Sequence, residues 1–63
     1  MNPRETFIAA AGAALDGYNY SRAKAEEATK PDRKDYWENQ AHDCENRARF
    51  YLARAREFEE EAA

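Results

Sequence analysis

The residues best suited to chemistry lie together in the second half of the chain. His42-Asp43-Cys44-Glu45 brings together an imidazole, a thiol and two carboxylates, which are groups that bind metals or transfer protons. A structural zinc site needs four ligands, and the di-iron bundle motif is Glu-x-x-His on paired helices, whereas Glu38 and His42 are four residues apart. A catalytic triad needs a second partner for the single histidine. We therefore expect no metal site, no cofactor and no enzymatic activity.

The length and charge of the chain limit the number of domains and the kinds of partner that it is expected to have. With 63 residues, it is expected to form one domain over 1–63 and to bury only about 60% of its unfolded surface. Charged residues make up 37% of the chain, but their signs are mixed and the net charge is −3. A nucleic-acid-binding protein would show a basic excess, so direct contact with nucleic acid is not expected. No stretch approaches the roughly 18 apolar residues that cross a bilayer, and the lone Cys44 suits a reducing cytoplasm.

Residues typical of a helix N-terminus predict a first helix at about 3–29. Asn2 can cap this helix and Pro3 suits its first position. Gly17 lowers helix stability by roughly 1 kcal/mol relative to alanine and belongs to a turn-forming dipeptide. The apolar spacing nevertheless continues through Gly17, which favours an unbroken helix over one that is kinked there.

A second helix is predicted at about 33–61. Pro31 disfavours helical geometry in the residue before it, so a turn is expected at about 30–32. Asp32 is then the expected cap of the second helix. Because this connection is short, the two helices should be antiparallel neighbours.

A heptad seam runs along both predicted helices. In the second helix it alternates large and small residues, at Trp37, Ala41, Cys44, Ala48, Tyr51, Ala55, Phe58 and Ala62. The first helix has a matching seam at Phe7, Ala11, Ala14, Tyr18, Ser21, Ala25 and Ala28. Folding at the proline places Phe7 opposite Ala55 and Tyr18 opposite Cys44, so that large side chains meet small ones. The expected fold is all-α, a coiled-coil-like antiparallel hairpin with an alanine-rich seam.

Several large side chains project away from this seam. Helical projection places Ile8, Leu15 and Leu52 on one flank, and Tyr20 and Phe50 on another. Scattered exposed apolar residues are ordinary, but paired ones on so small a hairpin favour a contact surface. The candidate partner-binding residues are Ile8, Leu15, Tyr20, Arg47, Phe50, Arg54, Glu57 and Glu60.

Four glutamates, Glu57, Glu59, Glu60 and Glu61, crowd the predicted end of the second helix. The helix macrodipole disfavours negative charge at this end. Two interpretations stay open: a solubilising helix end, or an acidic patch that binds a basic protein surface and so covers a nucleic-acid site.

In size, acidic balance and paired surface patches, the chain resembles the small phage-encoded proteins that inhibit host machinery, anti-CRISPR proteins among them. The resemblance lies in size and composition, and no functional residue carries over from it. It implies an inhibitor or adaptor in the host cytoplasm that docks on a partner protein, such as a nucleic-acid-processing complex. The alternative is a structural homodimer, in which two hairpins form a four-helix bundle over Ile8, Leu15 and Leu52.

Overall fold

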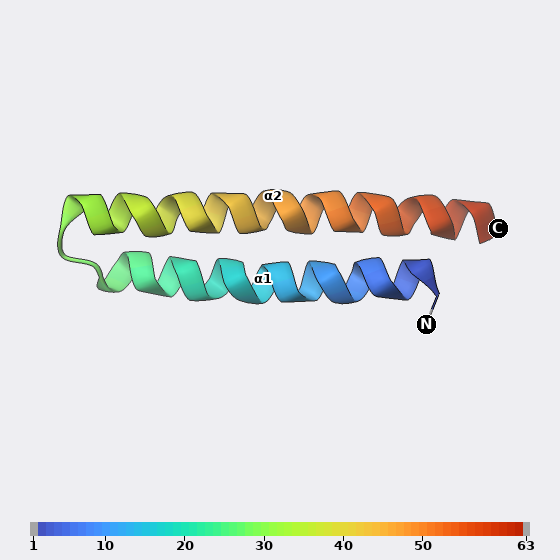
Figure 1. Ribbon diagram of the computed structural model, residues 1–63, viewed down its shortest axis with the longest axis horizontal. Coiled ribbons are helices and arrows are strands. Elements are labelled where there is room, and N and C mark those ends of the chain that lie inside the picture. The colour runs from blue at the N-terminus through green and yellow to red at the C-terminus, as the bar shows by residue number, and fades with distance from the viewer. Residues whose placement is uncertain (1, 63) are drawn as a thin grey trace.

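The chain forms a helical hairpin of two antiparallel helices packed against each other (Figure 1). The computed structural model describes residues 2–62, and their side chains through residue 58. Helix α1 spans Pro3–Glu27 and helix α2 spans Pro31–Ala62. The Cα trace measures 50 by 15 by 11 Å along its principal axes, and both ends of the chain lie at the same end of the rod. The expected all-α hairpin is thus confirmed.

Helix α1 begins with the predicted cap. The backbone N–H of Glu5 donates to Asn2 Oδ1 at 2.8 Å, and the Thr6 hydroxyl donates to the Asn2 carbonyl oxygen at 3.2 Å. Pro3 takes the first helical position, where its missing N–H would have no helical acceptor in any case. The helix then continues without interruption through Gly17, as the apolar spacing predicted.

The turn lies about two residues earlier than expected, at 28–30. Ala28 adopts an extended conformation and donates its N–H to the Lys24 carbonyl oxygen at 3.0 Å, which ends α1. Pro31 is already the first residue of α2, since the N–H of Lys34 donates to the Lys30 carbonyl oxygen at 3.0 Å. The prediction that Asp32 caps α2 is therefore wrong. Asp32 lies in the first helical turn, where the positive end of the helix dipole stabilises its carboxylate.

The two helices meet along the predicted seam. The most buried apolar residues among those described are all alanines, at 2–5% exposure: Ala11, Ala25, Ala41, Ala48 and Ala55. Ser21 joins them at 4% exposure. The larger seam residues through Phe58 are half-buried, while the side chain of Ala62 lies outside the described residues. This small-residue contact lets the helix axes approach closely but provides only a thin core.

Large side chains interlock along this seam. The Phe7 ring lies 5.7 Å from the Phe58 ring and 6.3 Å from the Tyr51 ring, measured between centroids. Phe7 therefore packs between two aromatic residues that lie one helical turn before and one helical turn after Ala55. Its predicted position opposite Ala55 agrees with this arrangement.

A second close approach lies near the middle of the hairpin. A Cβ atom placed on Gly17 would lie 3.0 Å from the Cys44 sulfur. Gly17 thus faces Cys44 and lies one position from Tyr18, the partner predicted for this cysteine.

Across the described residues, neither helix is both long and apolar enough to cross a bilayer.

Candidate functional site

The surface of the hairpin carries many large apolar side chains. A two-helix pair buries only one stripe of each helix, so residues on the flanks stay in contact with solvent. Six of them are 42–57% exposed, namely Ile8, Leu15, Tyr20, Tyr36, Phe50 and Leu52. Their distribution over the two sides of the seam determines which surfaces are available to a partner.

The exposed aromatic residues lie on one side of the seam. The rings of Tyr20 and Tyr36 each approach the Trp37 ring edge-on, with centroids 5.7 Å and 5.0 Å apart. Further along α2, the Phe50 ring lies 5.7 Å from the Tyr51 ring. We call the surface formed by these five residues the aromatic face. The edge-to-face contacts of Tyr20 and Tyr36 with Trp37 favour a defined orientation of these three rings.

A shallow groove crosses the aromatic face between the two helices. It has a volume of about 330 Å³ and is lined by Ala10, Ala13, Ala14, Gly17, Cys44, Arg47 and Tyr51. Small residues of α1 form one wall, and longer side chains of α2 form the other. The groove therefore offers a partner a recess bordered by an aromatic ring and a guanidinium group.

Arg47 and Arg54, two of the predicted partner-binding residues, have different surroundings. Arg47 lines the groove and makes no ion pair with any residue in the described part of the chain. Arg54 is engaged within the hairpin, because its guanidinium bonds the Glu57 carboxylate at 2.8 Å and lies 5.8 Å from the centroid of the Phe7 ring. Arg54 and Glu57 thus contribute to the packing of α2 over Phe7, while Arg47 is available to a partner.

The opposite side of the seam is aliphatic. Ile8 and Leu52 border a hollow of about 240 Å³ together with Arg4, Ala55 and Arg56. Leu15 follows Ile8 by seven residues and therefore lies on the same face of α1. We call Ile8, Leu15 and Leu52 the aliphatic face. The predicted partner-binding residues are therefore divided between two opposite surfaces.

Seven of the eight predicted partner-binding residues are exposed, and the side chain of the eighth, Glu60, lies outside the described residues. Three residues of the aromatic face, Tyr36, Trp37 and Tyr51, were not predicted as binding residues, and Tyr51, like Trp37, was assigned to the seam. Tyr36 precedes Phe50 by 14 residues, or about four helical turns, so helical projection could have placed both on one face. Trp37 was assigned to the seam, where it is half-buried and still presents part of its ring to solvent.

Among the described residues, no three His, Cys, Asp or Glu side chains are grouped as metal ligands. Open grooves of 220–380 Å³ lie on the surface of the hairpin. In comparisons with known proteins, the sequence matches no protein-family model, and no curated protein and no solved structure is significantly similar to it.

Proposed function

We propose that this chain is a non-enzymatic binding module that docks on a partner protein through its aromatic face. The observation that carries the proposal is the gathering of three aromatic side chains, Tyr20, Tyr36 and Phe50, each more than half exposed, on one side of the hairpin. Trp, Tyr and Arg dominate the residues that contribute most to protein–protein affinity, and this face provides all three types.

The dimensions of the hairpin are sufficient for such a contact. A standard interface buries about 800 Å² on each partner. One side of a rod whose Cα trace measures 50 by 15 Å offers a surface of that order. The groove and its aromatic rims would supply the central part of the interface, with Arg47 as its charged contact.

The proposed partner is a nucleic-acid-processing complex, and the proposed outcome is inhibition by covering its nucleic-acid-binding surface. The small size and the net charge of −3 support this form of the proposal. A negatively charged protein is repelled by nucleic acid and attracted to the basic surface that binds it. Because Glu57 is paired with Arg54, the acidic contribution would come from the chain as a whole more than from this one carboxylate.

Affinity capture from a lysate of the source cells tests the proposal. The tagged wild-type chain should retain a protein that the double variant Phe50→Ala/Arg47→Ala fails to retain, with equal helicity by circular dichroism. A matched double variant on the opposite face, Ile8→Ala/Leu52→Ala, should still retain it. Retention by the aromatic-face variant would contradict the proposal.

The aliphatic face favours a second candidate function, self-assembly. Two hairpins that met through Ile8, Leu15 and Leu52 would form a four-helix bundle and cover residues that are 42–48% exposed in one chain. Light scattering across a range of concentrations distinguishes the two candidates. A 7.3 kDa species favours the binding module, whereas a stable species of twice that mass, lost on Leu52→Gln, favours the homodimer.

A further inference from the structure

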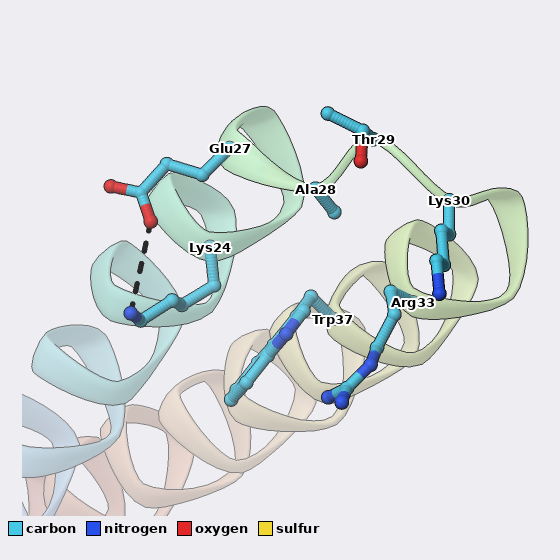
Figure 2. Close-up of a pocket in the computed structure, with 7 residues that line it drawn as sticks. All are labelled: Lys24, Glu27, Ala28, Thr29, Lys30, Arg33 and Trp37. Carbon is cyan, nitrogen blue, oxygen red and sulfur yellow. Dashed lines mark ion pairs between the residues drawn. The ribbon is translucent and has the colours of Figure 1, made fainter.

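The turn end of the hairpin carries a hollow that the proposed function does not yet use. It is open to solvent, has a volume of about 380 Å³ and is lined by Lys24, Glu27, Ala28, Thr29, Lys30, Arg33 and Trp37 (Figure 2). Figure 2 shows that Arg33 and Trp37 extend from the first turns of α2, while Lys24 and Glu27 lie on the α1 side. The hollow therefore joins both helices and the turn between them.

The apolar part of this hollow belongs to the aromatic face. Trp37 lines the hollow and is contacted edge-on by Tyr20 and Tyr36. The ammonium of Lys24 lies 5.5 Å from the centroid of the Tyr20 ring. A tryptophan held between two tyrosines gives a partner a large apolar contact whose orientation is fixed before binding.

The polar part of the hollow is basic, although the chain as a whole is acidic. Three cations and one carboxylate line it, and that carboxylate, Glu27, is paired with Lys24 at 3.7 Å. Within the part of the chain that the structure describes, Lys30 and Arg33 make no ion pair. The hollow thus places two cations without an acidic partner beside a tryptophan ring.

We propose that this turn-end hollow binds an acidic segment of the partner protein, with an apolar side chain against Trp37 and a carboxylate against Arg33 and Lys30. The inference rests on the proposed function and names the chemistry of the partner at one end of the aromatic face. The complementarity of charge carries it, because a guanidinium and an ammonium together favour carboxylate oxygens. A nucleic acid fits less well, since its affinity depends on many phosphate contacts and this hollow offers only two cations without an ion pair among the described residues.

Trp37 is the single tryptophan of the chain, so its fluorescence reports directly on this hollow. The probe is a synthetic 16-residue helical peptide with a leucine stripe flanked by glutamates and no aromatic residue. Titration into the purified chain should give a saturable change in Trp37 fluorescence that weakens as salt is raised. The same peptide with every Glu replaced by Gln should bind more weakly, by up to about fivefold. A fivefold loss is the upper end of the effect of an exposed ion pair.

Two variants that remove the same charge provide the matched comparison. Arg33→Gln should weaken binding of the acidic peptide about threefold to fivefold, as expected for loss of one exposed ion pair. Lys34→Gln removes the neighbouring exposed cation, which does not line the hollow, and should leave the affinity within about twofold.

Three results would overturn the inference: no saturable response to the acidic peptide, equal affinity for the glutamine peptide, or tighter binding of a single-stranded DNA oligonucleotide. These results are distinguishable from failure of the proposed function. If the chain captures a protein through Phe50 and Arg47 but its Trp37 ignores the acidic peptide, only the inference about the turn end is wrong. If the capture itself is insensitive to Phe50 and Arg47, the proposed function is wrong.

Discussion

At the scale of single residues, the two glycines of α1 have different surroundings. A Cβ on Gly17 would lie 3.0 Å from the Cys44 sulfur, closer than ordinary van der Waals contact. At Gly12, the corresponding position has open space, with no neighbouring side chain within 4 Å. Both glycines raise the entropic cost of forming the same helix, but only Gly17 makes room for the facing helix.

Alanine substitution should separate these two roles. Gly12→Ala should raise the free energy of unfolding by about 0.5–1 kcal/mol, because it restores helix propensity without a new contact. Gly17→Ala should gain less, since its methyl group would displace the sulfur of Cys44. In a Cys44→Ala background, Gly17→Ala should recover a gain similar to that at Gly12. Urea unfolding followed by circular dichroism measures all three values, and an unchanged effect of Gly17→Ala in the Cys44→Ala background would contradict the contact.

At the scale of helices, the alanine seam sets the distance between α1 and α2. Ala48 is 3% exposed, so a larger side chain there has no space unless the helices separate. Ala48→Leu should therefore lower the free energy of unfolding by about 1–3 kcal/mol. Ala53→Leu is the matched control, because Ala53 is exposed on the same helix and the change in helix propensity is the same. Equal stability of the two leucine variants in urea unfolding would show that the seam is not close-packed.

The start of α1 provides a second test at this scale. Asn2 accepts a hydrogen bond from the Glu5 N–H, so Asn2→Ala should lower the free energy of unfolding by about 1 kcal/mol. Asn19→Ala, at an exposed position within α1, should cause no loss, because alanine is the better helix former there. Thermal unfolding by circular dichroism compares the two, and a loss confined to the Asn19 variant would argue against the cap.

The helices and their seam could be predicted from the sequence because local chemistry and period determine them. Asn2 and Pro3 favour a helix start in any context, and the heptad alanines require a facing helix. The start of α2 could not be fixed in this way, since Pro31 can end one helix or begin the next. The hydrogen bond from the Lys34 N–H to the Lys30 carbonyl oxygen shows that Pro31 begins α2, and a sequence pattern does not display this bond.

The division of the surface was also only partly predictable. Projection along each helix grouped Ile8 with Leu52 and Tyr20 with Phe50, but it did not show that Trp37 joins the second group. The packed structure joins Tyr20 to Trp37 and Ile8 to Leu52, which defines the two faces. Trp37 was missed as a binding residue because a seam position is usually buried, whereas this one lies at the turn end, where a hollow opens beside it.

At the scale of the whole molecule, the hairpin is a thin rod with an aromatic face on one side and an aliphatic face on the other. Its most buried residues are small, chiefly alanines, and six large apolar side chains are exposed beside the seam. A rod of this kind can bind through one face while the other stays free. The proposed division of roles gives the aromatic face to a partner protein.

Hydroxyl-radical footprinting tests this central claim most directly, because it reports the exposure of individual aromatic and aliphatic side chains. The chain is oxidised alone and in complex with the captured partner, and the modified residues are identified by mass spectrometry. We predict that Tyr20, Tyr36 and Phe50 lose reactivity in the complex while Ile8 and Leu52 keep theirs. Protection of Ile8 and Leu52 with unchanged reactivity of the three aromatic residues would contradict the account.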